Sequence, residues 1–490
     1  MSGSSEALAE PPDPRRWAAL VILLTGAFLA PLDFFIVNVA MPAIATGLHA
    51  QSGEVQLVIS GYAVVYAVFL ITGGRLGDIF GRKQIFLAGL AGFAFASALC
   101  GLAWSPGSLI GGRLIQALAA AAMAPQALAS VHALFPAAER GRALAIYSFT
   151  LGLSSIAGQL LGGALVAADP GGFGWRLIFL INLPVAAVAF ACAIPLLRDT
   201  RSPRRPRLDL WGIVLSAAAL TSLVLPLIEG RERGWPVWSI LLLVAAPVFM
   251  EAFRRYEIRL ARQGGEPLVA MDAFRAPGLL RAIGAVATLY AMAAFFLTFP
   301  LYLQIGLGRS ALQAGIAILP LSAGFLFASF ASPSVARWTG RASSSIGYLL
   351  CALGILMTAR LVAITPAACG PPLALLAPTL AVAGFGMGTA IPMMMRVVIE
   401  RVEPHRAGLV GGLFNSTLQV SAAIAVAVLG GVFFTVLGGR SGPGPVAEAF
   451  TATLVGVALC HLTGALLAAG LGQRRQRVPV PLSTVARSSA

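Results

Sequence analysis

The feature that most constrains this chain is a series of long apolar stretches, each about as long as a lipid bilayer is thick. A helix that crosses the hydrocarbon core needs roughly 20 mostly apolar residues. Stretches of this kind recur along nearly all of the 490 residues. We assign fourteen of them, at residues 17–41, 55–73, 85–103, 108–134, 143–167, 176–197, 210–228, 237–253, 282–303, 312–334, 346–364, 372–394, 407–431 and 449–471.

Composition shows that the lipid, rather than a polar shell, surrounds these stretches. Hydrophobic residues make up 58% of the chain and charged residues 11%, whereas a soluble domain is roughly half apolar and a quarter charged. Each span should be a helix, because lipid offers no partner to an unpaired backbone group. The sequence therefore predicts an all-α polytopic membrane protein.

The basic residues predict the orientation of these spans. The net charge is +15, and most of the arginines fall in alternate loops, which are the cytoplasmic loops if both termini lie in the cytoplasm. This is the positive-inside pattern. A nucleic-acid surface would instead gather the charge on one soluble face, so we exclude that partner.

Two basic segments divide the chain. We expect a cytoplasmic N-terminal tail, a first group of six spans, basic linkers that enclose two extra spans, a second group of six spans, and a cytoplasmic C-terminal tail. Their boundaries are residues 1–16, 17–197, 198–281, 282–471 and 472–490. A weak echo of GRLGDIFGRKQ (from Gly74) in VARWTGRASS (from Val335) suggests that the two groups of six are repeats, as in many secondary transporters.

Two charged residues fall inside spans. Asp33 lies in the first span and Arg113 in the fourth, and a charge at such depth requires a partner or a cavity. We expect the two side chains to pair. Desolvation favours the protonated carboxyl group and a nearby guanidinium favours the charged one, so movement of the pair would load or release a proton. A static ion pair that only holds two helices together is the alternative.

Other polar residues suggest a cavity for substrate, and a set of small residues suggests a close contact between two helices. Asn38, Tyr62, Tyr66, Gln116, Gln159, Asn415 and Gln419 are candidates for lining a cavity that holds a drug-sized substrate. Ordinary hydrogen bonds between helices are the alternative for these side chains. Small residues in the fifth span form a stripe where another helix can approach closely, either in simple packing or at a seam that slides; they are Ser154, Gly158, Gly162 and Gly163.

The sequence contains no pattern that indicates catalysis. We find no cluster of metal ligands and no phosphate-binding loop, so we expect no cofactor, no metal site and no ATP-driven step. A sensor would need a sizeable soluble domain, and the loops are short. A lipid-modifying enzyme would need a nucleophile or a metal cluster. The expected partners are a small-molecule substrate, protons and the lipid bilayer, and we expect the protein to act as a monomer.

Several segments together resemble the major facilitator superfamily, in particular its fourteen-span drug:proton antiporter branch. Residues 74–83, GRLGDIFGRK, are similar to the signature loop of the superfamily, and residues 32–42, LDFFIVNVAMP, to the first-span motif of the branch. Arg113 with Gln116 matches the fourth-span motif. The remaining similar segments are WRLIFLINLP at 175–184, Gln304, and SALQAG at 310–315 with Pro320.

The resemblance implies two six-helix bundles with two inserted helices, which work by alternating access. A charged latch on the cytoplasmic side would be formed by Gly74, Asp78, Gly81, Arg82 and Lys83, and Asp33 and Arg113 would relay protons. The chain departs from the pattern at Gln159, where the branch has a proline, and at Ala117, where it has a glycine. The loss of a proline removes a kink and adds an amide.

We therefore expect a secondary active transporter in the cytoplasmic membrane of a bacterium, most simply a proton-driven exporter of drug-like compounds or natural products. Such a protein would confer resistance to antibiotics. A proton-coupled importer or facilitator of one metabolite on the same fold is the alternative. The sequence leaves the substrate, the coupling stoichiometry and the oligomeric state open.

Overall fold

A computed structural model describes residues 14–198, 208–230, 233–269, 271–401 and 407–471. Most of the predicted tails, 1–16 and 472–490, and part of the first basic linker lie outside these residues. Within them, fourteen helices or broken helices are long and apolar enough to cross a membrane. The protein is thus an all-helical, multi-pass membrane protein, as the sequence predicts.

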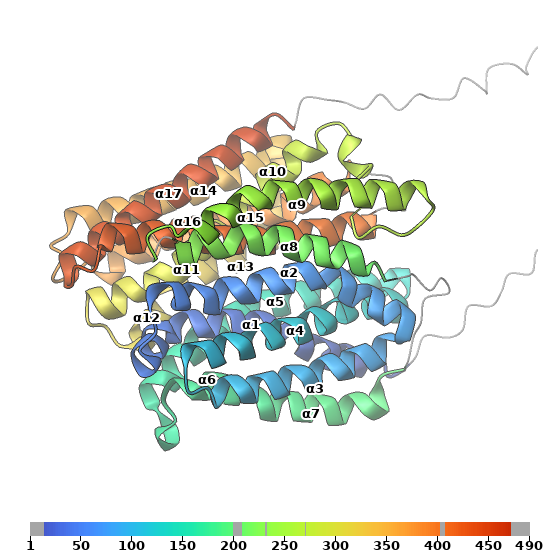
Figure 1. Ribbon diagram of the computed structural model, residues 1–490, viewed down its shortest axis with the longest axis horizontal. Helices are drawn as coiled ribbons and strands as arrows, with labels where there is room; N and C mark the ends of the chain where they lie inside the picture. Colours follow the sequence, from blue (N-terminus) through green and yellow to red (C-terminus); the bar gives the residue numbers. More distant parts are fainter. Residues whose placement is uncertain (1–13, 199–207, 231–232, 270, 402–406, 472–490) are drawn as a thin grey trace, which may run out of the picture.

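The first six spans form an N-terminal half (Figure 1). Their helices are α1 (Arg16–Leu48), α2 (Ser52–Phe80), α3 (Arg82–Gly101), α4 (Pro106–Leu134), α5 (Ala137–Ala168), α6 (Leu177–Leu180) and α7 (Asn182–Leu196). Within this half α4 packs against α2 and α3, and α1 packs against α5. The break between α6 and α7 has a local cause, because Pro184 has no N–H to donate to the carbonyl of Leu180.

The last six spans form a C-terminal half. Their helices are α10 (Leu279–Leu289), α11 (Met292–Leu301), α12 (Ala311–Ala317), α13 (Leu319–Thr339), α14 (Ser343–Ile364), α15 (Leu373–Ile399), α16 (Ala407–Leu437) and α17 (Pro443–Ala469). Two of the spans assigned from the sequence are broken here: 282–303 into α10 and α11, and 312–334 into α12 and α13. Pro320 lies just after the second break and cannot donate to the carbonyl of Ile316.

The two remaining spans form a hairpin, which we call the inserted hairpin. It consists of α8 (Leu210–Leu225), a π-helical turn (Pro226–Gly230) and α9 (Val237–Arg262). The hairpin packs against α2 of the N-terminal half and α16 of the C-terminal half, and Figure 1 shows α8 beside α2. It therefore lies over the seam along which α2 and α16 contact each other.

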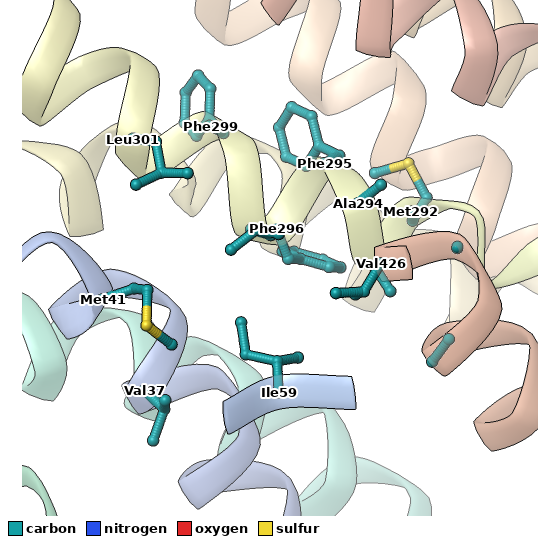
Figure 2. Packing of buried hydrophobic residues seen from close by; sticks show 14 of the residues in the cluster. Val37, Met41, Ile59, Met292, Ala294, Phe295, Phe296, Phe299, Leu301 and Val426 are labelled. Carbon is teal, nitrogen blue, oxygen red and sulfur yellow. The ribbon is translucent and has the colours of Figure 1, made fainter. Parts of the chain in front are cut away.

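Apolar side chains fill much of the space between the two halves. Figure 2 shows Val37, Met41 and Ile59 of the N-terminal half facing Phe296 and Leu301 of the C-terminal half. This packing belongs to the largest buried cluster of the described residues. These apolar contacts lack directional bonds, which suits surfaces that separate and meet again.

The loop between α14 and α15 offers a test of the predicted orientation. Its Cys369 is exposed, and it lies on the outer side if the N-terminus is cytoplasmic. We expect a membrane-impermeant maleimide to label Cys369 in intact cells, whereas the Cys369→Ser variant should lose this label. Labelling that requires broken cells would show that the orientation is the reverse.

Candidate functional site

Asp33 lies at the centre of a polar cluster inside the N-terminal half. The residue is fully buried on α1. Its Oδ2 accepts a hydrogen bond from Nη1 of Arg113, with which it forms an ion pair. Its Oδ1 accepts from Nε2 of Gln116 at 2.9 Å and from Nδ2 of Asn182 at 3.2 Å. The expected contact between Asp33 and Arg113 is therefore present, and the role of the pair in proton coupling stays a prediction.

Arg113 connects this cluster to one further helix, α2. Its Nη1 also donates to Oε1 of Gln116 at 2.7 Å, and its Nε donates to the carbonyl of Val58 on α2 at 3.3 Å. The guanidinium carbon lies 4.1 Å from the centre of the Tyr62 ring, a distance at which a cation is attracted to the ring face. Arg113 is 1% exposed, and its Nη2 has no partner.

Two members of the cluster were not among the predicted site residues. Ser97 on α3 accepts from Nε2 of Gln116 at 2.9 Å, and Nδ2 of Asn182 lies 3.4 Å from the same hydroxyl oxygen. Both residues are fully buried. A polar residue within an apolar span is the available signal in the sequence, but serines and asparagines of this kind occur in many spans. Asn182 appeared there only as a letter of the motif at 175–184.

The charge of Asp33 affects the contacts that four helices make with one another. Removal of one partner from a buried ion pair costs about 3–5 kcal/mol, because the remaining charge has no compensation. A proton added to Asp33 has a similar effect, because it leaves the Arg113 cation with only neutral acceptors. Protonation of one carboxyl group therefore changes the contacts among α1, α2, α4 and α7.

The predicted cavity-lining residues lie mostly within packed regions. Asn38, Tyr62, Gln116 and Gln159 are at most 3% exposed, while Tyr66 and Gln419 are half-buried. Asn415 lies on α16, but its side chain is outside the described residues. Burial alone does not show a binding site at these positions, so their role in binding substrate stays a prediction.

Several of these buried groups have polar atoms without partners. They are Oδ1 of Asn38, the hydroxyl of Tyr62 and both amide atoms of Gln159. Gln159 lies on the part of α5 that meets α12. Buried polar atoms usually find a partner in protein or water, so these atoms are unsatisfied hydrogen-bonding groups among the predicted residues.

A described cleft lies elsewhere, at the predicted outer end between the inserted hairpin and the N-terminal half. Its volume is about 480 Å³. None of its lining residues was predicted to bind substrate; they are Gln51, Glu54, Leu57, Ile110, Leu225, Glu229, Arg233 and Trp238.

The predicted latch residues make contacts within their own half. Arg82 pairs with Asp78 at 3.1 Å and donates to the carbonyl of Ala129 at 2.9 Å, and Lys83 donates to the carbonyl of Ile194 at 2.6 Å. Gly81 has a φ of 109°, which lets one residue connect α2 to α3. Gly74 lies next to Pro125.

A different residue of the signature loop reaches out of the N-terminal half. Arg75 donates to the carbonyl of Glu266 at 3.0 Å and to that of Pro267. These carbonyls belong to the segment that follows α9. The sequence showed that this loop is charged, but it did not show which charge leaves the half.

The stripe of small residues on α5 serves two different contacts. A Cβ on Gly158 would lie 2.7 Å from the carbonyl oxygen of Leu32, and one on Gly162 would lie 2.8 Å from that of Ile36, both on α1 of the same half. A Cβ on Gly163 would lie 2.5 Å from the carbonyl oxygen of Ala311 in the C-terminal half. Ser154 is buried and donates to the carbonyl of Leu151.

The two halves contact each other at the predicted outer end. Besides the contact at Gly163, the backbone oxygen of Gln159 would lie 2.5 Å from a Cβ on Gly315. Nε2 of Gln304 donates to the carbonyl of Val39 at 2.9 Å. Backbone lies directly against backbone here, so this end of the interface is closed.

Comparison with known proteins agrees with this architecture. The model of the Major Facilitator Superfamily matches residues 23–426. The chain is 35% identical to the probable actinorhodin transporter of Streptomyces coelicolor, over 89% of this chain and 75% of that protein. It is 33% identical to the cephamycin export protein CmcT of Amycolatopsis lactamdurans, over 96% of each chain.

Further similarity comes from a third relative and from solved structures. The puromycin resistance protein pur8 of Streptomyces alboniger is 35% identical, over 86% of this chain and 83% of that protein. A peptide transporter POT in complex with sulfate matches with a TM-score of 0.69 at 13% identity, over 92% of this chain and 94% of that chain. A bacterial homologue of the human lysosomal transporter Spinster matches with a TM-score of 0.66 at 19% identity, over 94% of this chain and 98% of that chain. These two structures establish the likeness of fold.

Proposed function

Because the chain belongs to the major facilitator superfamily, we propose that it exports drug-like or natural-product compounds across the cytoplasmic membrane in exchange for protons. It is a transporter rather than an enzyme. The relatives named above are transport, export or resistance proteins for antibiotics, which supports export of related compounds. We further propose that both termini are cytoplasmic and that one chain suffices for transport.

The observation that carries the proton-coupling proposal is the buried ion pair of Asp33 and Arg113. Asp33 is the acidic member of a cluster that joins α1, α2, α3, α4 and α7, and it lies on α1, which contacts the C-terminal half through α11. A proton that binds there changes the charge that Arg113 meets. Transport systems place titratable groups inside spans for this purpose.

We propose the following transport cycle. The outer end is closed in this structure, and substrate enters between the halves from the cytoplasmic side. The halves then rock, so that the contacts at Gly163 and Gln304 open and substrate leaves. A proton from outside binds Asp33 and weakens its attraction to Arg113, which favours return to the state that is closed at the outer end. The proton leaves to the cytoplasm.

Growth of a bacterial host that lacks its own efflux pumps tests the direction of transport. We expect expression of this protein to raise the concentration of aromatic polyketides or other amphipathic antibiotics that stops growth. Everted membrane vesicles with an acidic interior should accumulate the same compounds. Unchanged or increased sensitivity across the panel, together with uptake in the same direction as protons, would support the alternative of an importer.

A further inference from the structure

Two buried carboxyl groups face each other at the predicted cytoplasmic end of the inserted hairpin, far along the chain from the Asp33 cluster. Asp209 caps the start of α8, and Glu257 lies near the end of α9. Their exposed fractions are 5% and 0%. Neither residue belongs to the transport machinery described above.

Each carboxyl group has one oxygen with donors and one without. Oδ1 of Asp209 accepts from the amide of Gly212 at 2.9 Å and from the hydroxyl of Tyr256 at 2.8 Å. Oε2 of Glu257 accepts from the amide of Val269 at 2.8 Å. Oδ2 of Asp209 and Oε1 of Glu257 have no partner. Both of these free oxygens lie against the position that a Cβ on Gly212 would occupy.

A proton is the ligand that this geometry suits. Two ionised carboxylates that share a dry site repel each other, and such pairs hold one proton between them. The shared O–H supplies the donor that both free oxygens lack. A magnesium or calcium ion needs about six oxygen ligands, and the described part of the chain holds no group of three or more histidine, cysteine, aspartate or glutamate residues that could bind a metal.

The pair is connected to the N-terminal half through a short segment. Glu257 holds the amide of Val269, and Arg75 on α2 holds the carbonyls of Glu266 and Pro267. We call residues 266–269, which lead toward the C-terminal half, the tethered segment. The charged and titratable groups that face Glu257 come from three elements: Asp209 at the start of α8, Tyr256 on α9, and Arg75 on α2.

We propose that Asp209 and Glu257 share one proton, and that loss of this proton shifts the hold on the tethered segment from Arg75 to Glu257. When both carboxylates are charged, they repel each other. They also attract the nearby guanidinium of Arg75 away from the carbonyls of Glu266 and Pro267. The carbonyls that Arg75 held are then open to water, whereas the amide of Val269 is bound more tightly, because an ionised carboxylate is the stronger acceptor. The inserted hairpin lies over the α2–α16 seam. Its connection to the N-terminal half through the tethered segment therefore depends on the pH at the cytoplasmic side.

Hydrogen–deuterium exchange of the full-length protein in lipid nanodiscs tests this proposal. Exchange is followed by mass spectrometry on peptides that cover 263–272, in buffers from mildly acidic to mildly alkaline, and corrected for the intrinsic pH dependence of exchange. We expect the corrected protection of the Val269 amide, and so of the wild-type peptide that contains it, to rise as pH rises. The Glu257→Gln variant, in which this group is always neutral, should lose that pH response.

The matched control is Glu251→Gln, because Glu251 lies on the same helix, is 40% exposed and pairs with Arg254 and Arg255. It should respond to pH as the wild type does. Asp209→Asn removes the other sharing group and should also lose the response, which keeps the test open if Glu257→Gln does not fold. Equal pH responses in all variants would overturn the proposal. Protection that depends on added Mg²⁺ at constant pH would overturn it in favour of a metal site. No transport is measured, so the outcome is independent of the proposed function.

Discussion

Asp33→Asn is expected to abolish proton-driven accumulation of substrate while leaving downhill movement in place. Asparagine keeps the size of Asp33 but cannot bind a proton at neutral pH, and it replaces one of the two acceptor oxygens with an amide group that donates. In proteoliposomes with an imposed pH gradient, substrate concentrations on the two sides should equalise instead of diverging. The wild-type protein should move protons in the direction opposite to that of the substrate, and the variant should move no protons with it.

The same substitution also removes the negative charge next to Arg113, so stability must be measured beside transport. An uncompensated buried charge costs about 3–5 kcal/mol, and a lower midpoint of thermal unfolding is therefore expected. Asp33→Glu separates the two effects, because it disturbs packing but keeps a titratable group, and it should retain part of the coupling. Asp169→Asn, at the left-handed C-cap of α5, is the matched control and should transport as the wild type does. Wild-type coupling in Asp33→Asn would refute the assignment of Asp33.

Gly163→Val is expected to stop transport in a protein that still folds. The added Cβ would lie 2.5 Å from the carbonyl oxygen of Ala311 and 2.9 Å from Cα of Leu312, and backbone cannot move aside as a side chain can. Overpacking of this kind costs about 1–3 kcal/mol, which shifts the conformational equilibrium by roughly tenfold to a hundredfold away from closure at the outer end.

Accessibility of a cysteine at position 304 measures this shift. In a background without the native cysteines, Gln304→Cys should react faster with an impermeant reagent when Gly163→Val is also present. Gly158→Val contacts only α1 of its own half, so it should lower stability instead. Gly111→Val is the control, because no atom lies within 4 Å of a Cβ there. Equal labelling rates with and without Gly163→Val would show that this contact does not govern closure.

The sequence predicted the spans and the central ion pair because both signals are local. Twenty apolar residues in a row have one stable arrangement in lipid, and a single Asp33 or Arg113 among them is conspicuous. The neutral partners Ser97 and Asn182 were missed for the opposite reason, since each resembles many polar residues that only bond to their own helix. The spacing of Gly158, Gly162 and Gly163 indicated close approach, but it carried no information on which helix approaches each of them.

The amino-acid order by itself therefore determined the helices, the membrane environment, the predicted orientation and the two charges that need each other. The tertiary structure decided which groups meet: Asn182 with Asp33, Arg75 with the segment after α9, Gly163 with the opposite half, and Asp209 with Glu257. The physical reason is that hydropathy acts on each stretch of chain separately. Hydrogen bonds and steric contacts act over a few ångströms between helices, and only packing brings residues so far apart in the chain within that range.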